Sequence, residues 1–496
     1  MAWQPGLGSA ASDAPDPADP SANAPADEPP GAVENAPGDA PERDSEARAA
    51  VLGEREAEAH VRAACFTPGP PGRTGVELEW PGGDPADPGR LPPPGVLDAA
   101  LAPLAEPGAL PGGGRITREP GGQIELSSSP AATLDGCVRA AAEDVARLRH
   151  ALADAGLAAL GLGLEPHLTP PRTLDHPRYR AMESYFDRFG PAGRVMMRAT
   201  ASVQISLDAG DESDGVTGYR HRWLLAHRIG PVLVAAFANS PLWRGRPTGW
   251  VSTRQALWAR IDPGRTRPPD PDEGRNAPGA HGVPGAAGVP GAGVPGIGGE
   301  GAGGDGGDPR AAWARYALDA QLLCVRRTPP ATWTAPPGRT FRSWLRGPFG
   351  ERPPRLADLE YHLGTLFPPV RPRGWLELRM IDAQPGDDWT VPLAVVRTLL
   401  DDPQAARAAY EATEPLTGGR PLPRPDLWLR AARLGLAEPG LATAARACLA
   451  AADSALARDP ACAEVRRIVG EFTDRYASRG RCPADDQLDQ LEGARR

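Results

Sequence analysis

The sequence predicts a fold of mixed α-helices and β-strands, organised around one sheet with an apolar face and a polar face. Four short stretches alternate apolar with polar side chains, which is typical of strands that bury one face. Longer stretches repeat apolar residues at helical spacing, both between these strands and after them. Hydrophobic residues make up 41% of the 496 residues, enough to build a sizeable core.

The first expected strand spans residues 74–80 and carries Glu77 and Glu79 opposite its large apolar side chains. Taken alone, this pattern also fits an ordinary strand with solvated acids. The second stretch is more specific, because Glu119 and Glu125 stand on either side of a Pro-Gly-Gly turn and Glu125 belongs to a short alternating run. Carboxylates held on a strand and beside a turn are the ligands that a hard cation such as Mg²⁺ needs.

The third expected strand is long, from residue 196 to 208, and places Gln204 on its polar face. The fourth spans residues 375–382, with Glu377 and Arg379 opposite its apolar side chains. If the four strands share one sheet, its polar face is a floor of carboxylates with an arginine.

Such a floor has a physical consequence. Crowded carboxylates raise one another's pKa values, and divalent cations or arginines relieve the repulsion. Carboxylates, Mg²⁺ and arginines around an open space are the parts needed to bind nucleotide phosphates and to stabilise phosphoryl transfer. The pattern does not establish that the strands are neighbours, so a set of separate solvated strand faces is the alternative.

Helical periodicity and turn residues place the other elements. Helices are expected near residues 44–64, 134–152, 218–237 and from 391 to the end, and a buried strand at 158–165. The helices after residue 391 have the amphipathic pattern of bundle packing.

Composition excludes several classes of protein. All 54 basic residues are arginine, so the chain has no P-loop lysine, Schiff-base lysine or kinase strand lysine. Residues 1–42 carry eight acids and no basic residue, while the whole chain has a net charge of −9. The rest is therefore close to neutral, which gives no support to nucleic-acid binding.

Low-complexity segments divide the chain. Residues 1–45 are expected to be a disordered acidic tail, and residues 268–309 a Gly- and Pro-rich insert. They leave a main domain at 46–412, interrupted by the insert, and a helical segment at 413–496 packed on it. The sequence shows no membrane-spanning stretch and no secretory signal, and its six cysteines form no paired motif, so the cytoplasm is the expected compartment.

Five motifs occur in the order seen in one known family. They are Gly-Val-Glu-Leu-Glu at 75–79, Glu-Pro-Gly-Gly-Gln-Ile-Glu-Leu-Ser at 119–127, the strand at 200–208, Phe-Ala-Asn-Ser-Pro at 237–241 and Trp-Leu-Glu-Leu-Arg at 375–379. In these residues the chain resembles the glutamate–cysteine ligases, and most of all the plant-like branch with the bacterial relatives that supply ergothioneine synthesis. The resemblance covers about residues 60–410.

The resemblance implies an α+β fold in which an antiparallel sheet curves into a funnel with helices outside, similar to the catalytic fold of glutamine synthetase and guanido kinases. It implies ATP and Mg²⁺ as cofactors, L-glutamate and L-cysteine as substrates, and no obligate protein partner. The expected metal ligands are Glu77, Glu79, Glu119, Glu125 and Glu377. The expected nucleotide contacts are Gln204, Asn239 and Arg379, and the arginines expected to contact phosphate or glutamate are Arg254 and Arg379.

Departures from the family pattern and rival functions remain open. The sequence around Arg198 differs from the plant pattern, so this arginine receives no role. The cysteines do not reproduce the spacing of the plant redox disulfides. A ligase that joins glutamate to another amine, a phosphotransferase such as a guanido kinase and a non-catalytic nucleotide-binding scaffold are the alternatives to glutamate–cysteine ligation.

Overall fold

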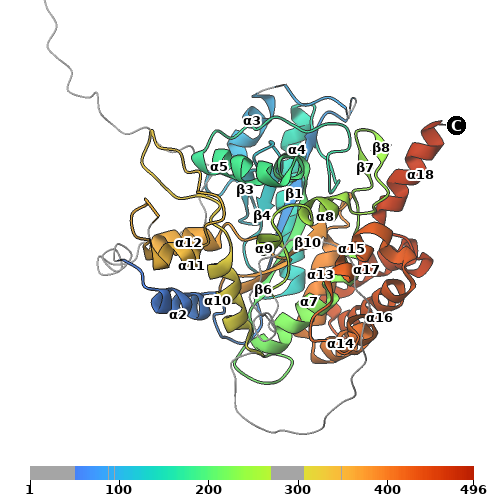
Figure 1. Ribbon diagram of the computed structural model, residues 1–496. Helices are drawn as coiled ribbons and strands as arrows, with labels where there is room; N and C mark the ends of the chain where they lie inside the picture. The colour runs from blue at the N-terminus through green and yellow to red at the C-terminus, as the bar shows by residue number, and fades with distance from the viewer. Residues whose placement is uncertain are drawn as a thin grey trace, which may run out of the picture. The chain divides into compact units, whose positions relative to one another are not determined.

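One antiparallel sheet of six strands lies at the centre of the protein (Figure 1). The computed structural model describes residues 51–495, apart from residues 86, 88, 94, 270–306 and 348. In spatial order the strands are β3 (Arg115–Arg118), β4 (Ile124–Ser127), β1 (Thr74–Trp80), β6 (Ser202–Asp208), β10 (Trp375–Asp382) and β9 (Val370–Pro372). The four strands expected to carry the polar floor are therefore consecutive neighbours, and the antiparallel mixed fold is confirmed. The funnel shape stays a prediction.

Three helices cover the apolar face of this sheet. These are α4 (Leu134–Asp154), α7 (Tyr219–Ala236) and α13 (Thr390–Asp401), which pack against β1, β10 and β6. Leu78, Ile205 and Leu378 point into the core on this side and are at most 1% exposed. The alternation of these strands therefore separates core from polar face as the sequence predicts.

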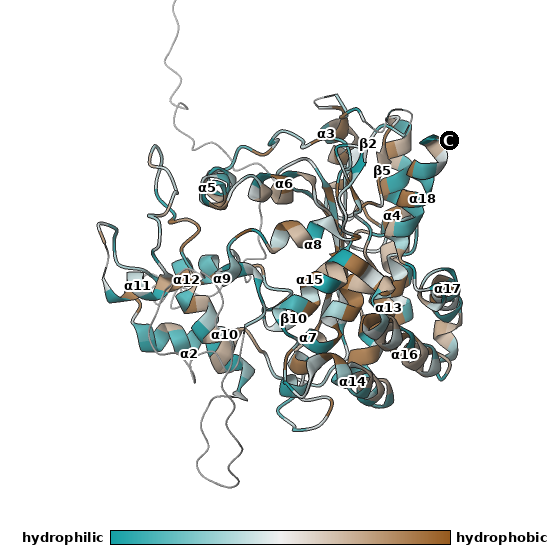
Figure 2. Cartoon of the chain, turned by 45° about the vertical axis from the view of Figure 1, so that its right-hand side comes forward, coloured by the Kyte–Doolittle hydropathy of each residue, from teal (hydrophilic) through white to brown (hydrophobic). Residues whose placement is uncertain are grey.

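The carboxyl-terminal part is helical throughout. It contains α14 (Pro403–Thr417), α15 (Pro425–Leu434), α16 (Pro439–Leu456), α17 (Ala463–Arg475) and α18 (Pro483–Arg495). Helices α14, α15 and α16 pack against α7, and apolar residues concentrate along α13 and α16 (Figure 2). The expected division between residues 412 and 413 lies inside α14, and all described residues fall within one compact unit. The division into two parts stays a prediction.

The remaining helices flank the sheet on its other sides. They are α2 (Glu54–Ala64), α3 (Val96–Leu101), α5 (Pro177–Phe186), α6 (Ala192–Ala199), α8 (Thr253–Trp258), α9 (Pro263–Thr266), α10 (Pro309–Asp319), α11 (Phe341–Arg346) and α12 (Leu356–Leu363). Two small two-stranded pairs join β2 (Gly82–Gly83) to β5 (Ala158–Ala159) and β7 (Leu242–Trp243) to β8 (Arg246–Pro247). No helix of the described residues combines the length and the apolar composition needed to cross a membrane.

Three expected elements differ from the structure. The long strand from residue 196 begins only at Ser202, because the preceding residues form α6, whose helical face buries Met196 and Met197. The expected strand at 158–165 is reduced to β5, because the backbone after it bonds to different segments: the N–H of Gly163 donates to Asn239 and that of Glu165 to Ala199. Ile381 was expected on the polar face of the last strand. A register shift after Leu378 in β10 instead places it in the core.

Parts of the expected tail and insert lie outside the described residues, namely 1–50 and 270–306. The helix expected from residue 44 is observed as α2 from Glu54. The described ends of the insert are partly ordered, because α10 already begins at Pro309.

A pair of glycine substitutions tests how the carboxyl-terminal helices pack. A Cβ added at Gly230 in α7 would lie 2.1 Å from the ring of Trp428 in α15. Gly230→Ala is therefore expected to lower the free energy of unfolding by about 1–3 kcal/mol through overpacking. Gly470→Ala in α17, where no atom lies within 4 Å of the added Cβ, is expected to raise it by about 0.5–1 kcal/mol through helix propensity. Urea unfolding of both variants measures this, and equal effects would contradict the packing of α15 on α7.

Candidate active site

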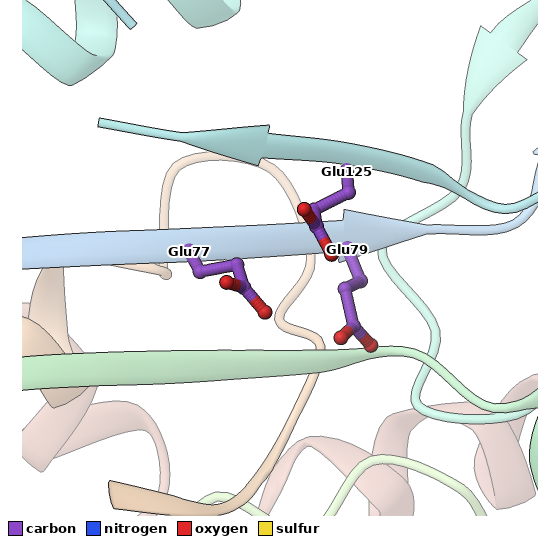
Figure 3. A group of neighbouring side chains, drawn as sticks. All are labelled: Glu77, Glu79 and Glu125. Carbon is purple, nitrogen blue, oxygen red and sulfur yellow. The ribbon is translucent and has the colours of Figure 1, made fainter. Parts of the chain in front are cut away.

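Three carboxylates meet on the polar face of the sheet. Glu77 and Glu79 come from β1, and Glu125 comes from the neighbouring strand β4 (Figure 3). Each offers one oxygen, and these three oxygens lie within 4.8 Å of one another. The register explains the meeting, because Glu79 stands directly opposite Glu125 in the antiparallel pair.

Glu119 joins this group from the turn between β3 and β4. The backbone N–H of Glu119 donates to Gln123 at 2.9 Å, and Gly122 takes a φ of 89° that favours glycine. Gly121 lies against α6, where a Cβ would come within 2.0 Å of the Arg198 carbonyl oxygen. Both glycines are therefore needed for a turn that brings Glu119 up to Glu125.

The pKa values report crowding of negative charge. Burial, and after it the charges of neighbouring carboxylates, raise the pKa of Glu125 to about 8 and that of Glu119 to about 7. Burial, followed by the charges of Glu125, Glu377 and Glu79, also raises the pKa of Glu77 well above its usual value. The group thus carries more negative charge than the protein compensates.

A hydrogen-bonded chain crosses the sheet from these acids to β9. Nε2 of Gln204 donates to Glu77 and, over 2.8 Å, to Glu79. Arg379 in turn donates from Nη1 to the Gln204 amide oxygen and, over 2.5 Å, to Glu377. Gln204 therefore bridges acids and arginine, with both ends of its amide in use.

Glu377 differs from the other acids in its electrostatic environment. Arg371 donates to its two oxygens from Nε over 2.8 Å and from Nη2 over 3.0 Å. Although burial alone would raise the pKa of Glu377, the charges of Arg371 and Arg379 hold it well below its usual range. The structure thus brings Glu377 next to Glu77 on the same face, but gives its carboxylate two arginine partners.

The residues present fit Mg²⁺. A hard cation takes oxygen ligands, and the group Glu77, Glu79 and Glu125 supplies them at close quarters, with Glu119 beside Glu125. A cation would also remove the repulsion that helps to raise the pKa values of Glu77, Glu119 and Glu125. Glu377 is the one expected ligand whose charge is already neutralised.

Arg254 lies buried at the edge of this face. It belongs to α8, is 3% exposed and donates from Nη2 to the carbonyl oxygen of Arg379 over 2.9 Å. Burial lowers its pKa, and the charges of Asp382 and Glu79 act in the opposite direction. Its closeness to both Arg379 and Glu79 places it beside the carboxylate group. Its contact with phosphate or glutamate stays a prediction.

The side-chain amide of Asn239 is hydrogen-bonded to other parts of the protein. Its Nδ2 donates to Gly161 and to Ala383, each over 2.7 Å, and its Oδ1 accepts from Gln487 over 2.6 Å. The prediction that Asn239 contacts the nucleotide is not supported, because its whole amide is used to join three segments of the chain.

Sequence reasoning missed several residues of the site. Thr117, directly opposite Glu125 in β3, donates its hydroxyl to that carboxylate over 2.5 Å. Tyr179 lies close enough for the charge of Glu119 to add to the effect of burial in raising its pKa. Arg371 and Asp382 also escaped notice. Only Thr117 had a usable signal, since it alternates with Ile116 in a short run before the Pro-Gly-Gly turn.

Comparison with known proteins identifies the family. The sequence profile of glutamate-cysteine ligase family 2 (GCS2) matches residues 73–277 and 304–496. The chain is 38% identical over 441 residues to the glutamate–cysteine ligase EgtA of Mycobacterium tuberculosis, covering 87% of this chain and 89% of that one. It is 30% identical over 275 residues to the chloroplastic glutamate–cysteine ligase of Nicotiana tabacum, covering 54% of this chain and 46% of that one.

Among solved structures, the glutamate–cysteine ligase of Francisella tularensis in complex with AMP superimposes with a TM-score of 0.44 at 11% identity, over 86% of each chain. The profile match and the identity to EgtA show that the chain belongs to glutamate–cysteine ligase family 2. It is therefore a ligase, and the resemblance read from its five motifs is confirmed.

The raised pKa values predict an unusual dependence of stability on pH. A carboxyl that keeps its proton in the folded state above pH 4.5, where the unfolded chain has lost it, makes stability fall as pH rises toward the folded pKa. For Glu125 that window runs from 4.5 to about 8. In the presence of a chelator, Glu125→Gln is expected to raise the Tm at pH 8 by about 1–3 °C and to flatten the decline between pH 5 and pH 8. Thermal unfolding across this range measures it, and an unchanged pH slope would refute the assignment.

Proposed function

We propose that this ligase joins the γ-carboxylate of L-glutamate to the amine of L-cysteine, with conversion of ATP to ADP and phosphate. The observation that carries the proposal is the divided polar face of the sheet, with crowded carboxylates on β1 and β4 beside an arginine on β10. Family membership supports the reaction class. The funnel-shaped site implied by the resemblance belongs to this proposal, with the polar face of the sheet as its wall.

The reaction proceeds in two steps. The γ-carboxylate of glutamate attacks the terminal phosphorus of ATP, which gives an acyl phosphate and releases ADP. The amine of cysteine then attacks the acyl carbon, the amide bond forms and phosphate leaves. Neither step needs a covalent bond to the protein, in agreement with the lack of a nucleophile motif in the sequence.

The acidic residues have a binding role in this proposal. Glu77, Glu79, Glu119 and Glu125 would hold Mg²⁺, which when bound supplies positive charge to the phosphate oxygens of the nucleotide. Glu377, expected as a further ligand, would instead keep Arg379 in place, because its carboxylate is shared by Arg371 and Arg379.

The arginines face the anionic parts of the substrates. Among the described residues, both side-chain hydrogen bonds of Arg379 use Nη1, so the rest of its guanidinium is left for a phosphate oxygen. Arg254 would take a carboxylate of glutamate, since a buried guanidinium with unused donors favours an anionic partner.

The proposal also includes the pathway that uses the product and the compartment in which the enzyme works. The product, γ-glutamylcysteine, would be consumed by ergothioneine synthesis, the pathway implied by the resemblance. All six cysteines are buried, as suits a protein of the reducing cytoplasm.

The activity is tested with purified protein, ATP, Mg²⁺, glutamate and cysteine. Release of phosphate is expected to require both amino acids, and mass spectrometry should find γ-glutamylcysteine. Preference for another amine at equal concentration would favour a different carboxylate–amine ligase. A stable phosphorylated substrate would indicate a phosphotransferase, and nucleotide binding without turnover would indicate a scaffold.

Substitution of one acid tests the assignment of the carboxylates. Glu125→Gln keeps the size of the side chain but removes a charge from the metal ligands, so kcat/KM is expected to fall by about a hundredfold or more. Glu212→Gln, which breaks an ion pair with Arg310 away from the sheet, is the control and should stay within about twofold of the unaltered enzyme. Near-normal turnover of Glu125→Gln would remove this residue from the site.

A further inference from the structure

Asp382 is a buried acid to which neither the motifs nor the proposed reaction assigns a role. It is the last residue of β10, beyond the register shift that follows Leu378, and it is 2% exposed. A buried carboxylate is costly unless hydrogen bonds and a positive charge compensate it. The partners of Asp382 therefore indicate what this position does.

Two separate segments converge on the Asp382 carboxylate. Its Oδ2 accepts from the backbone N–H of Asn239 over 2.9 Å and from the hydroxyl of Ser240 over 2.7 Å. Its Oδ1 accepts from the hydroxyl of Ser252 over 3.0 Å and lies 3.8 Å from Nη1 of Arg254. Asp382 thus ties the loop after α7 and the beginning of α8 to the end of the central strand.

These contacts fix both the backbone and the side chain of Arg254. Its backbone N–H donates over 3.1 Å to the same Ser240 hydroxyl that donates to Asp382. Its Nη2 donates to Arg379 on β10. Nη1 is attracted by the charge of Asp382, but 3.8 Å is too long for a hydrogen bond.

Arg254 is left with unused donors in a buried place. Among the described residues, nothing accepts a hydrogen bond from its Nε or Nη1. A guanidinium that is 3% exposed and has two such donors is prepared for an anion that completes its hydrogen bonding. Asp382 lies beside its Nη1 and packs closely against Gly163, where an added Cβ would lie only 2.6 Å from the Asp382 Cβ.

We infer that Asp382 is a positioning residue of the ligase, which holds Arg254 in the orientation that receives the carboxylate of the amino-acid substrate. The inference rests on the proposed function, in which Arg254 contacts glutamate. It adds that the affinity for glutamate depends on a carboxylate that does not itself touch the substrate. Asparagine at this position would keep the size but would remove the charge that attracts Nη1 and would turn an amide N–H₂ toward existing donors.

A double-mutant cycle tests the inference. Asp382→Asn is expected to raise the KM for glutamate by about thirtyfold, with the KM for ATP within about twofold. Because Asp382 acts through Arg254, the double variant Asp382→Asn with Arg254→Ala should be no worse than Arg254→Ala alone, within about twofold. Multiplication of the two single effects would overturn the inference, and so would a fall in kcat with no change in KM.

A matched control separates positioning from general stability. Asp401 pairs with the buried guanidinium of Arg222 over 2.6 Å, between α13 and α7 and away from the polar face. Asp401→Asn should lower the Tm but leave the KM for glutamate within about twofold. If Asp382→Asn does not fold, Ser240→Ala removes only the bridging hydroxyl and should raise that KM by about threefold to tenfold.

Calorimetric binding of glutamate in the presence of Mg²⁺ and ADP keeps the two proposals distinguishable. If the unaltered protein binds glutamate but forms no dipeptide, the proposed function fails. Weaker binding by Asp382→Asn than by Asp401→Asn would then still support the positioning role. Equal glutamate affinity of these two variants would overturn it, whatever the turnover.

Discussion

The site depends on one constraint, the crowding of several carboxylates on one face of an antiparallel sheet. Alternation puts Glu77 and Glu79 on the same side of β1, and the register sets Glu79 opposite Glu125 and Glu77 opposite Gln204. A change of register cannot separate these acids, because a shift by one residue would turn the apolar side chains away from α4, α7 and α13, which cover them. The packing of the core therefore holds together charges that repel one another, and this repulsion adds to burial in raising the pKa values of Glu119 and Glu125.

The polar face is divided along the order of the strands. Acids without a matching cation lie on β1 and β4, whereas on β10 and β9 Arg371 and Arg379 neutralise Glu377. Gln204 on β6 lies at the boundary and is suited to it, since an amide donates to the acids with one end and accepts from Arg379 with the other. In the proposed function, a metal-bound polyphosphate would have its cation on the side with excess negative charge and its phosphates toward the arginines.

Much of this face could be predicted from sequence, because period-two alternation is a local property. This alternation predicted β1, β4, β6 and β10 and the polar residues on their outward faces. Two short strands were missed, β3 and β9, together with the partners that they contribute, Thr117 and Arg371, of which only Thr117 had a usable signal. The alternation also took α6 for a strand, since neighbouring methionines fit either period until tertiary packing decides. Asn239 belonged to a recognisable motif, yet its amide is used within the protein.

Asp382 shows why residues that orient a binding side chain are not predicted from local sequence patterns. Its position in the strand says nothing, because the register shift in β10 interrupts the alternation that identified Glu377 and Arg379. Its partners Ser240 and Ser252 lie 142 and 130 residues away in the chain. Ser240 and the backbone N–H of Asn239 belong to the motif at 237–241, but nothing in the sequence pairs them with Asp382, and only folding brings them to its carboxylate. The acids proposed to bind metal can be recognised from the alternation of their strands, whereas the residues proposed to orient Arg254 come together only in the fold. Motifs can therefore name the reaction of such an enzyme, but the contacts that orient Arg254 join residues of different segments and become visible only in the fold.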